Sequence, residues 1–278
     1  MVITVRASGA PADVLDRAGS FLAADPIRNH LILRLLHGRV RYPAPGRYWV
    51  AEGRGRCAGV VFQSPLHFVA TLTPMDDDAV CALVEAIAGE GVRLPGVTGV
   101  AATAARFAGH WAETTRASAA PRLGQRLYEV ERVVPPRPAP GRIRLAGAGD
   151  EPLLLQWFAA FGRETGEGGA NPDLAAAVRR RVESGALWVW DDDGPVSMAG
   201  LSDTHAGVAC VGPVYTPPER RSRGYASALV AGLSQGALDR PGRCVLYTDL
   251  ANPVSNGIYR AIGYRAVAEV LRYEFTPE

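Results

Sequence analysis

Hydrophobic positions along the chain follow two recurring patterns, which predict a mixed α/β fold. Short runs rich in β-branched and aromatic residues predict strands, and apolar residues at helical spacing between them predict helices. In the first half, the expected strands are Val2–Val5, Tyr48–Ala51, Ala58–Gln63, Phe68–Leu72, Val97–Val100 and Arg126–Val133. The expected helices there begin near Asp25–Pro26 and cover Ala79–Ala88 and Ala101–Thr114.

A similar order of elements returns in the second half. The expected strands are Ile143–Leu145, Leu187–Trp190, Val196–Asp203, Val208–Thr216, Cys244–Leu250 and Ala266–Phe275. The expected helices are Glu151–Phe161, Pro172–Glu183, one that begins near Tyr225, and Asn252–Ile262. The run Trp49–Glu52 followed by Ala58–Val60 is echoed by Trp188–Asp191 followed by Ala199–Leu201. We therefore interpret the chain as two copies of one fold.

The boundary between the two copies is expected in the segment Val133–Arg142, which holds four prolines in ten residues. Such a segment is typical of a semi-rigid, extended spacer. The predicted domains are residues 1–134 and 142–278, with a linker at 135–141.

One stretch, Val208–Leu233, combines a strand, a turn and a helix start. Pro213 has no amide donor, so the strand must bulge or break there, and Pro217–Pro218 ends it. Between this strand and the helix lie Arg221, Ser222, Arg223, Gly224, Tyr225 and Ala226. A glycine turn that opens a helix offers free backbone N–H groups and the positive end of the helix dipole, which favours an anion such as a pyrophosphate. The alternative is an ordinary turn with solvated arginines.

The order strand, R-x-x-G-x-A, amphipathic helix resembles the acyl-CoA-binding core of the GNAT superfamily of N-acetyltransferases. A second motif downstream, Asn252–Tyr259 followed by Ile262–Gly263–Tyr264, resembles that superfamily's N-x-x-A/S-x-x-x-Y-x-x-x-G-F/Y segment. The resemblance implies two tandem GNAT-like domains with a mixed sheet, of which the C-terminal one binds acetyl-CoA or another short acyl-CoA. The implied cofactor-binding residues are Val214, Tyr215, Thr216, Arg221, Ser222, Arg223, Gly224, Tyr225, Ala226, Ser227, Asn252 and Asn256.

The resemblance also implies how this strand would act. It would splay away from Cys244–Leu250, so that the pantetheine arm pairs with Val214 and Thr216 as an extra strand would. The N-terminal copy carries Asp76–Asp78 where the C-terminal copy has its arginines. Three carboxylates at a helix start would repel a pyrophosphate, so this copy is expected to be degenerate and to bind no CoA.

The residues Asn252, Asn256 and Tyr259 fall on one face of the predicted helix. We expect this face to meet the ligand while Val254, Ile258, Ala261 and Ile262 pack on the sheet. Tyr259 is the expected catalytic residue, which donates to the leaving thiolate. The alternatives are that Asn252 merely caps the helix, and that Tyr259 is a tyrosine at the edge of the core.

The sequence does not single out a general base. Cys210 occupies the position four residues before Val214 where some family members carry a carboxylate, and a buried cysteine more often serves packing. Asp203 and His205 near a strand end, and Glu164 and Glu167 in a polar loop at Gly162–Asn171, are weaker candidates. This loop and the interface between the two domains are the expected sources of the acceptor pocket.

Composition narrows the function further. A net charge of +2 disfavours a dedicated nucleic-acid binder, and the lack of lysine among the 30 basic residues excludes a lysine nucleophile. The four cysteines show no C-x-x-C spacing, so no metal site is expected, and no long apolar run indicates a membrane partner. We expect a cytoplasmic N-acetyltransferase that acts on an amine of a small molecule or peptide. A non-catalytic acyl-CoA-binding or regulatory protein, a nucleotide-phosphate binder and a homodimer stay open.

Overall fold

The computed structural model describes residues 2–166, 173–240 and 242–277. Its contacts divide the chain into two compact units, the first of residues 1–127 with 267–278 and the second of residues 128–266. The chain passes into the second unit within strand β6 (Ser118–Val130) and returns within β12 (Arg265–Thr276). Because β6 and β12 each contribute residues to both units, the boundaries of the units differ from those of the domains expected from the sequence.

The strands form a mixed sheet, which confirms the predicted fold class. Among the described residues it has twelve strands in the order β1-β2-β3-β4-β5-β12-β6-β11-β10-β9-β8-β7. Most neighbours are antiparallel, and the parallel pairs include β4 with β5 and β10 with β11. In each unit, the parallel pair is joined by a crossover helix, as the two-copy interpretation predicts.

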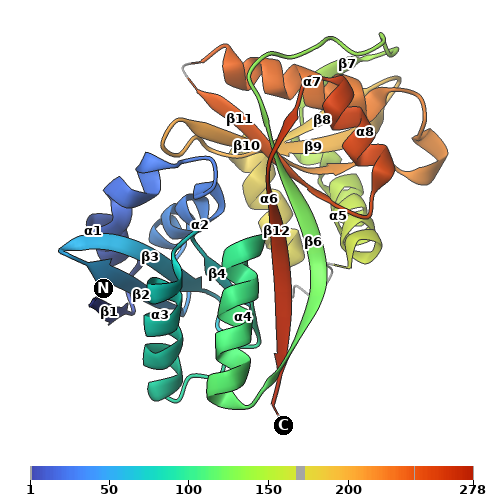
Figure 1. Cartoon of the computed structure of the whole chain (residues 1–278). Helices are drawn as coiled ribbons and strands as arrows, with labels where there is room; N and C mark the ends of the chain where they lie inside the picture. The colour runs from blue at the N-terminus through green and yellow to red at the C-terminus, as the bar shows by residue number, and fades with distance from the viewer. Residues whose placement is uncertain (1, 167–172, 241, 278) are drawn as a thin grey trace. The chain divides into compact units, whose positions relative to one another are not determined.

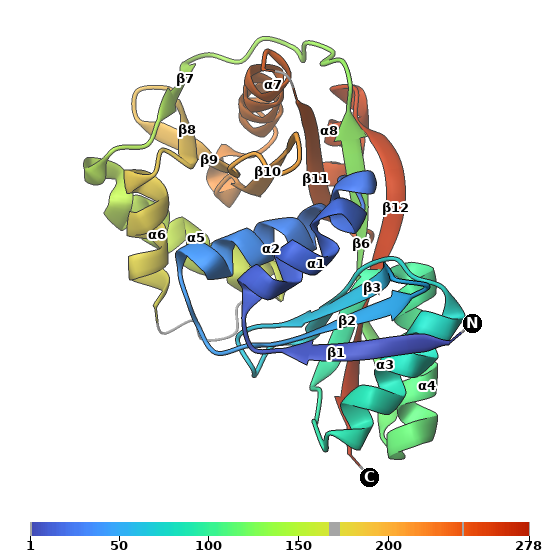
Figure 2. The same cartoon turned by 90° about the vertical axis from the view of Figure 1, so that its left-hand side faces the viewer.

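In the first unit, helices cover both faces of the strands (Figure 2). Alternation along β2 sends Trp49 and Ala51 to the α3–α4 side and Tyr48 and Val50 to the α1–α2 side. The elements are β1 (Ile3–Ser8), α1 (Pro11–Ala24), α2 (His30–Arg41), β2 (Arg47–Gly53), β3 (Arg56–Gln63), β4 (Ala70–Leu72), α3 (Asp77–Gly89), β5 (Gly96–Val100), α4 (Ala101–Thr115) and most of β6 and β12.

The second unit has the same layered arrangement (Figure 1). Ala199 on β9 packs with α7, whereas its neighbour Met198 packs with α5 and α6 on the opposite face. The elements are β7 (Arg142–Leu145), η1 (Ala148–Asp150), α5 (Glu151–Thr165), α6 (Leu174–Glu183), β8 (Leu187–Asp191), β9 (Pro195–Leu201), β10 (Val208–Tyr215), η2 (Pro218–Arg220), α7 (Tyr225–Leu238), β11 (Arg243–Asp249) and α8 (Pro253–Ala261).

Strand β6 and helix α2 begin several residues away from their predicted starts. Strand β6 starts at Ser118, eight residues before the predicted start, because its first half contains Pro121 and Gly124 and shows no clear alternation. It is tied to β12 by ion pairs of Arg122 with Glu274 and Arg126 with Glu269, which local periodicity does not reveal. Helix α2 begins at His30 rather than near Pro26.

The proline-rich segment packs against the second unit. The N–H of Val134 donates to the carbonyl of Ile262, and the indole N–H of Trp190 donates to the carbonyl of Pro140. With Gly232 and neighbouring residues of α7, the segment lines an apolar groove of about 450 Å³. The proline-rich segment, which was expected to be a spacer, is thus part of the second unit.

The backbone at position 263, in the second motif, requires glycine. Its φ is +104°, and a Cβ there would lie 2.5 Å from the carbonyl oxygen of Arg132. We expect Gly263→Ala to lower the free energy of unfolding by about 1–3 kcal/mol, because backbone has no room to yield. Gly257→Ala is the matched control, since a Cβ at this helical position meets nothing within 4 Å. Urea unfolding of both variants checks this, and equal stability would contradict it.

Candidate functional site

The parallel strands β10 and β11 part at the centre of the second unit. They pair from Val208 with Arg243 to Val211 with Leu246, and the pairing recorded among the described residues ends there although both strands continue. Beyond this point β10 bulges at Gly212–Pro213 and pairs only with β9 on its other side. At Val214 and Tyr215, the β11 side of β10 therefore has no strand pairing recorded among the described residues.

Helix α7 is the next α-helix after β10 in the chain, separated from it by a segment that contains η2. Its first residue follows Gly224, whose φ of +85° is in the left-handed region, and no side chain caps the helix. Ser222 also has a positive φ of 63°, and residues 221–224 are exposed. No side chain therefore occupies the first N–H groups of α7, and their binding of an anion stays a prediction.

The corresponding crossover helix of the first unit differs at this point. The Asp76 carboxylate accepts a hydrogen bond from the N–H of Ala79 at 2.9 Å and so caps α3. Asp77 and Asp78 add two more carboxyl groups to its first turn. The helix end is thus satisfied from within and negatively charged, which agrees with the degenerate copy predicted from the sequence.

Comparison with known proteins supports the same fold. Residues 195–273 match the family described as FR47-like protein. An acetyltransferase from the GNAT family of Colwellia psychrerythraea has 11% sequence identity and a TM-score of 0.63, with coverage of 98% of this chain and 100% of the other. The chain has the GNAT acetyltransferase fold. A comparison with curated proteins finds no match.

Further solved structures show that the likeness to GNAT proteins extends over both units. A GCN5-related N-acetyltransferase from Sphaerobacter thermophilus has 18% identity and a TM-score of 0.63, covering 98% of this chain and 94% of the other. A tandem GNAT protein from the clavulanic acid biosynthesis pathway has 12% identity and a TM-score of 0.59, covering 98% of each chain. The tandem GNAT arrangement inferred from the sequence is therefore confirmed at the level of fold.

Within this GNAT fold, Arg221 is held by residues of its own unit. Its Nη2 lies 2.7 Å and 3.0 Å from the two carboxylate oxygens of Glu164, and its Nε donates to the carbonyl of Thr216 at 2.9 Å. The guanidinium also lies over the ring of Tyr215, whose hydroxyl donates to Glu164. Sequence reasoning missed these contacts because Glu164 is far away along the chain.

The start of α7 is anchored by a second contact. The buried side chain of Tyr225 donates its hydroxyl to Asp192 in the β8–β9 turn. This hydrogen bond, followed by desolvation, raises the pKa of Tyr225, while Arg223 acts on the same hydroxyl in the opposite direction. The contact ties the turn at residues 221–224 to the β8–β9 hairpin, and Ala226 and Ser227 follow Tyr225 on the first turn of the helix.

The predicted division of faces on α8 is right for Ile258 and Ile262, which pack in the core, and wrong for Val254 and Ala261, which are exposed. Val254 is 70% exposed, whereas Asn256 and Tyr259 are buried. The Asn256 amide donates to the carbonyls of Asp249 and Asn252, and its oxygen accepts from the Tyr128 hydroxyl. Its polar atoms are thus used inside the protein, because the helix meets polar backbone at its own start. Asn252 caps α8 by accepting from the N–H of Ser255, and its contact with a cofactor stays a prediction.

Tyr259 lies in a mostly apolar environment. Its ring makes an edge contact with Tyr264, and among the described residues no hydrogen bond of its hydroxyl is recorded. Burial raises the pKa of Tyr259 to about 12. The phenol therefore stays protonated through the neutral range and can act as a hydrogen-bond donor.

The candidate bases are not brought together. Cys210 is half-buried with its thiol against the carbonyl of Val211, and Asp203 lies exposed beyond β9. His205 forms an isolated bridge with Val208. Glu164 lies at the end of β10 through Tyr215 and Arg221, while Glu167 and the rest of the loop up to Pro172 lie outside the described residues.

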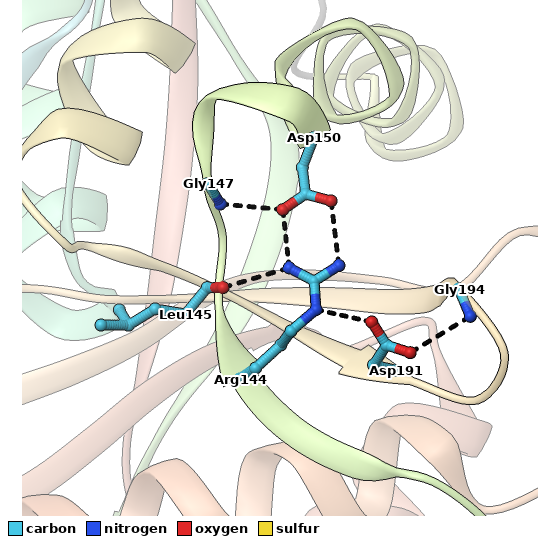
Figure 3. Close-up of polar contacts among 6 residues, drawn as sticks. All are labelled: Arg144, Leu145, Gly147, Asp150, Asp191 and Gly194. Carbon is cyan, nitrogen blue, oxygen red and sulfur yellow. Dashed lines mark hydrogen bonds and ion pairs between the residues drawn. The ribbon is translucent and has the colours of Figure 1, made fainter.

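Arg144 is a supporting residue that the sequence did not indicate. Its guanidinium spans two carboxylates, donating from Nη1 and Nη2 to Asp150 and from Nε to Asp191 (Figure 3). Asp150 also accepts from the N–H of Gly147, and Asp191 from the N–H of Gly194. Arg144 thereby joins the start of α5 to the β8–β9 turn that holds Tyr225.

The hydrogen bonds from Arg144 lower the pKa of the carboxyl groups of Asp150 and Asp191.

These pKa values make the contribution of Arg144 to stability pH-dependent. A carboxyl whose pKa is lower in the folded state stabilises the fold above its unfolded pKa of about 3.9, and this stabilisation is lost as pH falls through the folded value. We expect Arg144→Met to lower the midpoint of urea unfolding at neutral pH, with a gap from wild type that narrows below about pH 4.

The matched control is Arg179→Met, which removes an exposed ion pair with Glu151 and should change stability little. A gap between wild type and Arg144→Met that stays constant with pH would contradict the assignment.

Proposed function

We propose that the C-terminal unit is an N-acyltransferase that moves an acetyl or other short acyl group from acyl-CoA directly to an amine. The observations that carry this proposal are the exposed glycine turn at the N-terminus of α7 and the end of the pairing between β10 and β11. The turn offers an anion site, and the parted strands offer an edge for an extended arm. The N-terminal unit, with Asp76 on its corresponding helix, is proposed to bind no CoA.

Main-chain groups would hold most of the cofactor. The N–H groups of Tyr225, Ala226 and Ser227 would bind the pyrophosphate, and the exposed Arg223 would add charge. Arg221 is already paired with Glu164, so we assign it mainly to holding the Thr216 carbonyl and the end of β10. Val214 and Thr216 would pair with the pantetheine arm through their backbones.

The transfer itself breaks the C–S bond of the thioester and forms a C–N bond to the acceptor amine. The amine loses a proton, and the thiolate leaves as a thiol once it has gained one. A backbone N–H near Thr216 would polarise the thioester carbonyl, as in an oxyanion hole. Tyr259 would donate a hydrogen bond to the sulfur as negative charge develops on it.

Proton affinities limit what Tyr259 can do. With its pKa raised to about 12, the phenol is a weaker acid than a thiol of pKa about 8.5. Complete proton transfer from the phenol to the thiolate would therefore cost roughly 5 kcal/mol. Tyr259 thus stabilises the leaving group through the hydrogen bond, and the excess proton of the amine finally protonates the sulfur.

The acceptor is proposed to be an amine that is already partly neutral. No strong base is placed beside the cofactor site among the described residues, since Glu164 is engaged by Arg221. At neutral pH an α-amine of pKa about 7.7–8.0 is roughly a tenth unprotonated, whereas a lysine side chain of pKa about 10.4 is below a thousandth. We therefore favour α-amines or weakly basic amines of small molecules or peptides.

The experiment that tests the function is an acceptor screen with acetyl-CoA in which release of the free thiol is detected. Steady turnover with an amine, faster for α-amines than for matched ε-amines, supports the proposal. CoA binding without turnover on any amine would instead indicate a non-catalytic acyl-CoA-binding protein. Faster acetylation of ε-amines would contradict the proposed acceptor class.

Gly224 tests the anion site. A side chain at its φ of +85° is strained, so Gly224→Ala should distort the turn and weaken CoA binding about 10–100-fold, the equivalent of one charge-assisted contact. Gly236→Ala on the same helix is the matched control, since a Cβ there meets nothing within 4 Å. Calorimetric titration with CoA measures both. Equal affinities for the two variants would show that the turn does not bind the cofactor.

Tyr259 tests the catalytic step. Removal of a hydrogen bond that forms mainly in the transition state lowers kcat and leaves binding nearly intact. We expect Tyr259→Phe to lower kcat at least about tenfold, while the affinity for CoA changes by less than about threefold. The exposed Tyr42 offers a control, because Tyr42→Phe should alter neither quantity. If kcat survives and affinity falls, Tyr259 is a binding residue.

A further inference from the structure

Helices α3 and α4 of the N-terminal unit bring three metal-ligating side chains together outside the proposed acyl-CoA site. Asp77 and Cys81 are four residues apart, so they lie on one face of α3, and His110 comes from α4. The Cys81 Sγ lies 3.4 Å from His110 Nε2, and the same nitrogen lies 3.4 Å from Asp77 Oδ1. All three ligand atoms lie within 4.8 Å of one another.

The arrangement does not suit a thiol–imidazole–carboxylate catalytic triad. In such a triad the carboxylate and the nucleophile occupy opposite nitrogens of the imidazole. Here Asp77 and Cys81 both approach Nε2, which can carry only one proton. A cation placed between the three atoms would satisfy all of them at once.

The separations match those of a tetrahedral zinc centre. Bond lengths of about 2.3 Å for Zn–S and about 2.0–2.1 Å for Zn–N and Zn–O give a sulfur–nitrogen edge of about 3.5 Å and a nitrogen–oxygen edge of about 3.3 Å. Both observed distances, 3.4 Å, lie within about 0.2 Å of these edges. Cys81 Sγ also lies 3.9 Å from His110 Nδ1, so the imidazole would have to turn about its Cβ–Cγ bond to direct Nε2 at the ion.

The surroundings also favour a cation. His110 Nδ1 lies 4.0 Å from a carboxylate oxygen of the exposed Glu113, longer than a hydrogen bond, and a rotation of Glu113 would let it accept from Nδ1 as the carboxylate behind a metal-bound histidine commonly does. The charged groups that act on the Cys81 thiol are the carboxylates of Asp77, Asp78 and Glu85. These carboxylates give the cluster a net negative charge, which attracts a cation.

We propose that Asp77, Cys81 and His110 bind a divalent cation of the zinc class, with Glu113 as the orienting residue behind the histidine. Three protein ligands leave a fourth tetrahedral position for water. Binding releases the thiol proton to solvent and joins α3 to α4. Because only the folded unit presents the three ligands together, the ion should stabilise this unit by mass action.

Cobalt offers a direct test, since a Co²⁺–thiolate bond gives a charge-transfer absorption band. The full-length protein, freed of metal with a chelator and desalted, is titrated with Co²⁺ and then with Zn²⁺. We expect a band that saturates at one Co²⁺ per chain and disappears as Zn²⁺ displaces the ion. Zn²⁺ should also raise the melting temperature.

Variants assign the band to this cluster. Cys81→Ser should abolish it, whereas Cys57→Ser, which removes another half-buried thiol of the same unit, should leave it unchanged. His110→Gln should weaken Co²⁺ binding by more than about tenfold, and Glu113→Gln by about tenfold with the band retained. Circular dichroism of the metal-free variants verifies folding, and Asp77→Asn, with an exposed ligand, provides a second weakened variant if Cys81→Ser misfolds. No band in the wild type, or a band that survives Cys81→Ser, would overturn the proposal.

Discussion

The proposed site of the C-terminal unit depends on the start of helix α7, where no side chain accepts from the first backbone N–H groups. Among the described α-helices only α3 and α8 begin with a side-chain cap, from Asp76 and Asn252, and the other six, α7 included, begin without one. On α7 a glycine with positive φ takes that position, and no side chain completes it. What distinguishes the start of α7 from the other uncapped starts is its exposed turn with a glycine of positive φ, where the first N–H groups can bind water or an anion. The parting of β10 and β11 extends the same site along the sheet.

The neighbouring elements hold this helix end in place. Tyr225 is anchored to the β8–β9 turn through Asp192, and Arg144 fixes the next residue of that turn, Asp191, to the start of α5. At the other side Arg221 joins the end of β10 to α5 through Glu164. The site is thus positioned by ion pairs and hydrogen bonds among separate elements, whereas the ligand contacts themselves fall mainly to the backbone.

Local features of the site could be predicted from the sequence, whereas contacts between residues far apart in the chain could not. The glycine turn, the strand break at Pro213 and the Asp76 cap are encoded within a few residues, and the structure has all three. Contacts such as that of Arg221 with Glu164 join residues far apart in the chain, which periodicity cannot reveal. On α8, Ile258 and Ile262 pack as predicted, but Asn256 was wrongly placed outside by its hydropathy, because the backbone carbonyls around the helix start satisfy its amide. Cysteine spacing likewise gave no hint of the Cys81 cluster, since its histidine comes from another helix.

The central claim is that one of two related crossover helices binds the cofactor because its N-terminus is open, and the other does not because it is capped and acidic. Calorimetric titration of the intact chain with CoA tests this claim most directly. The account predicts one site per chain, and the same stoichiometry after Asp76→Ala, since Asp77 and Asp78 keep the first turn of α3 negative. Two sites per chain in the wild type, or none, would contradict it.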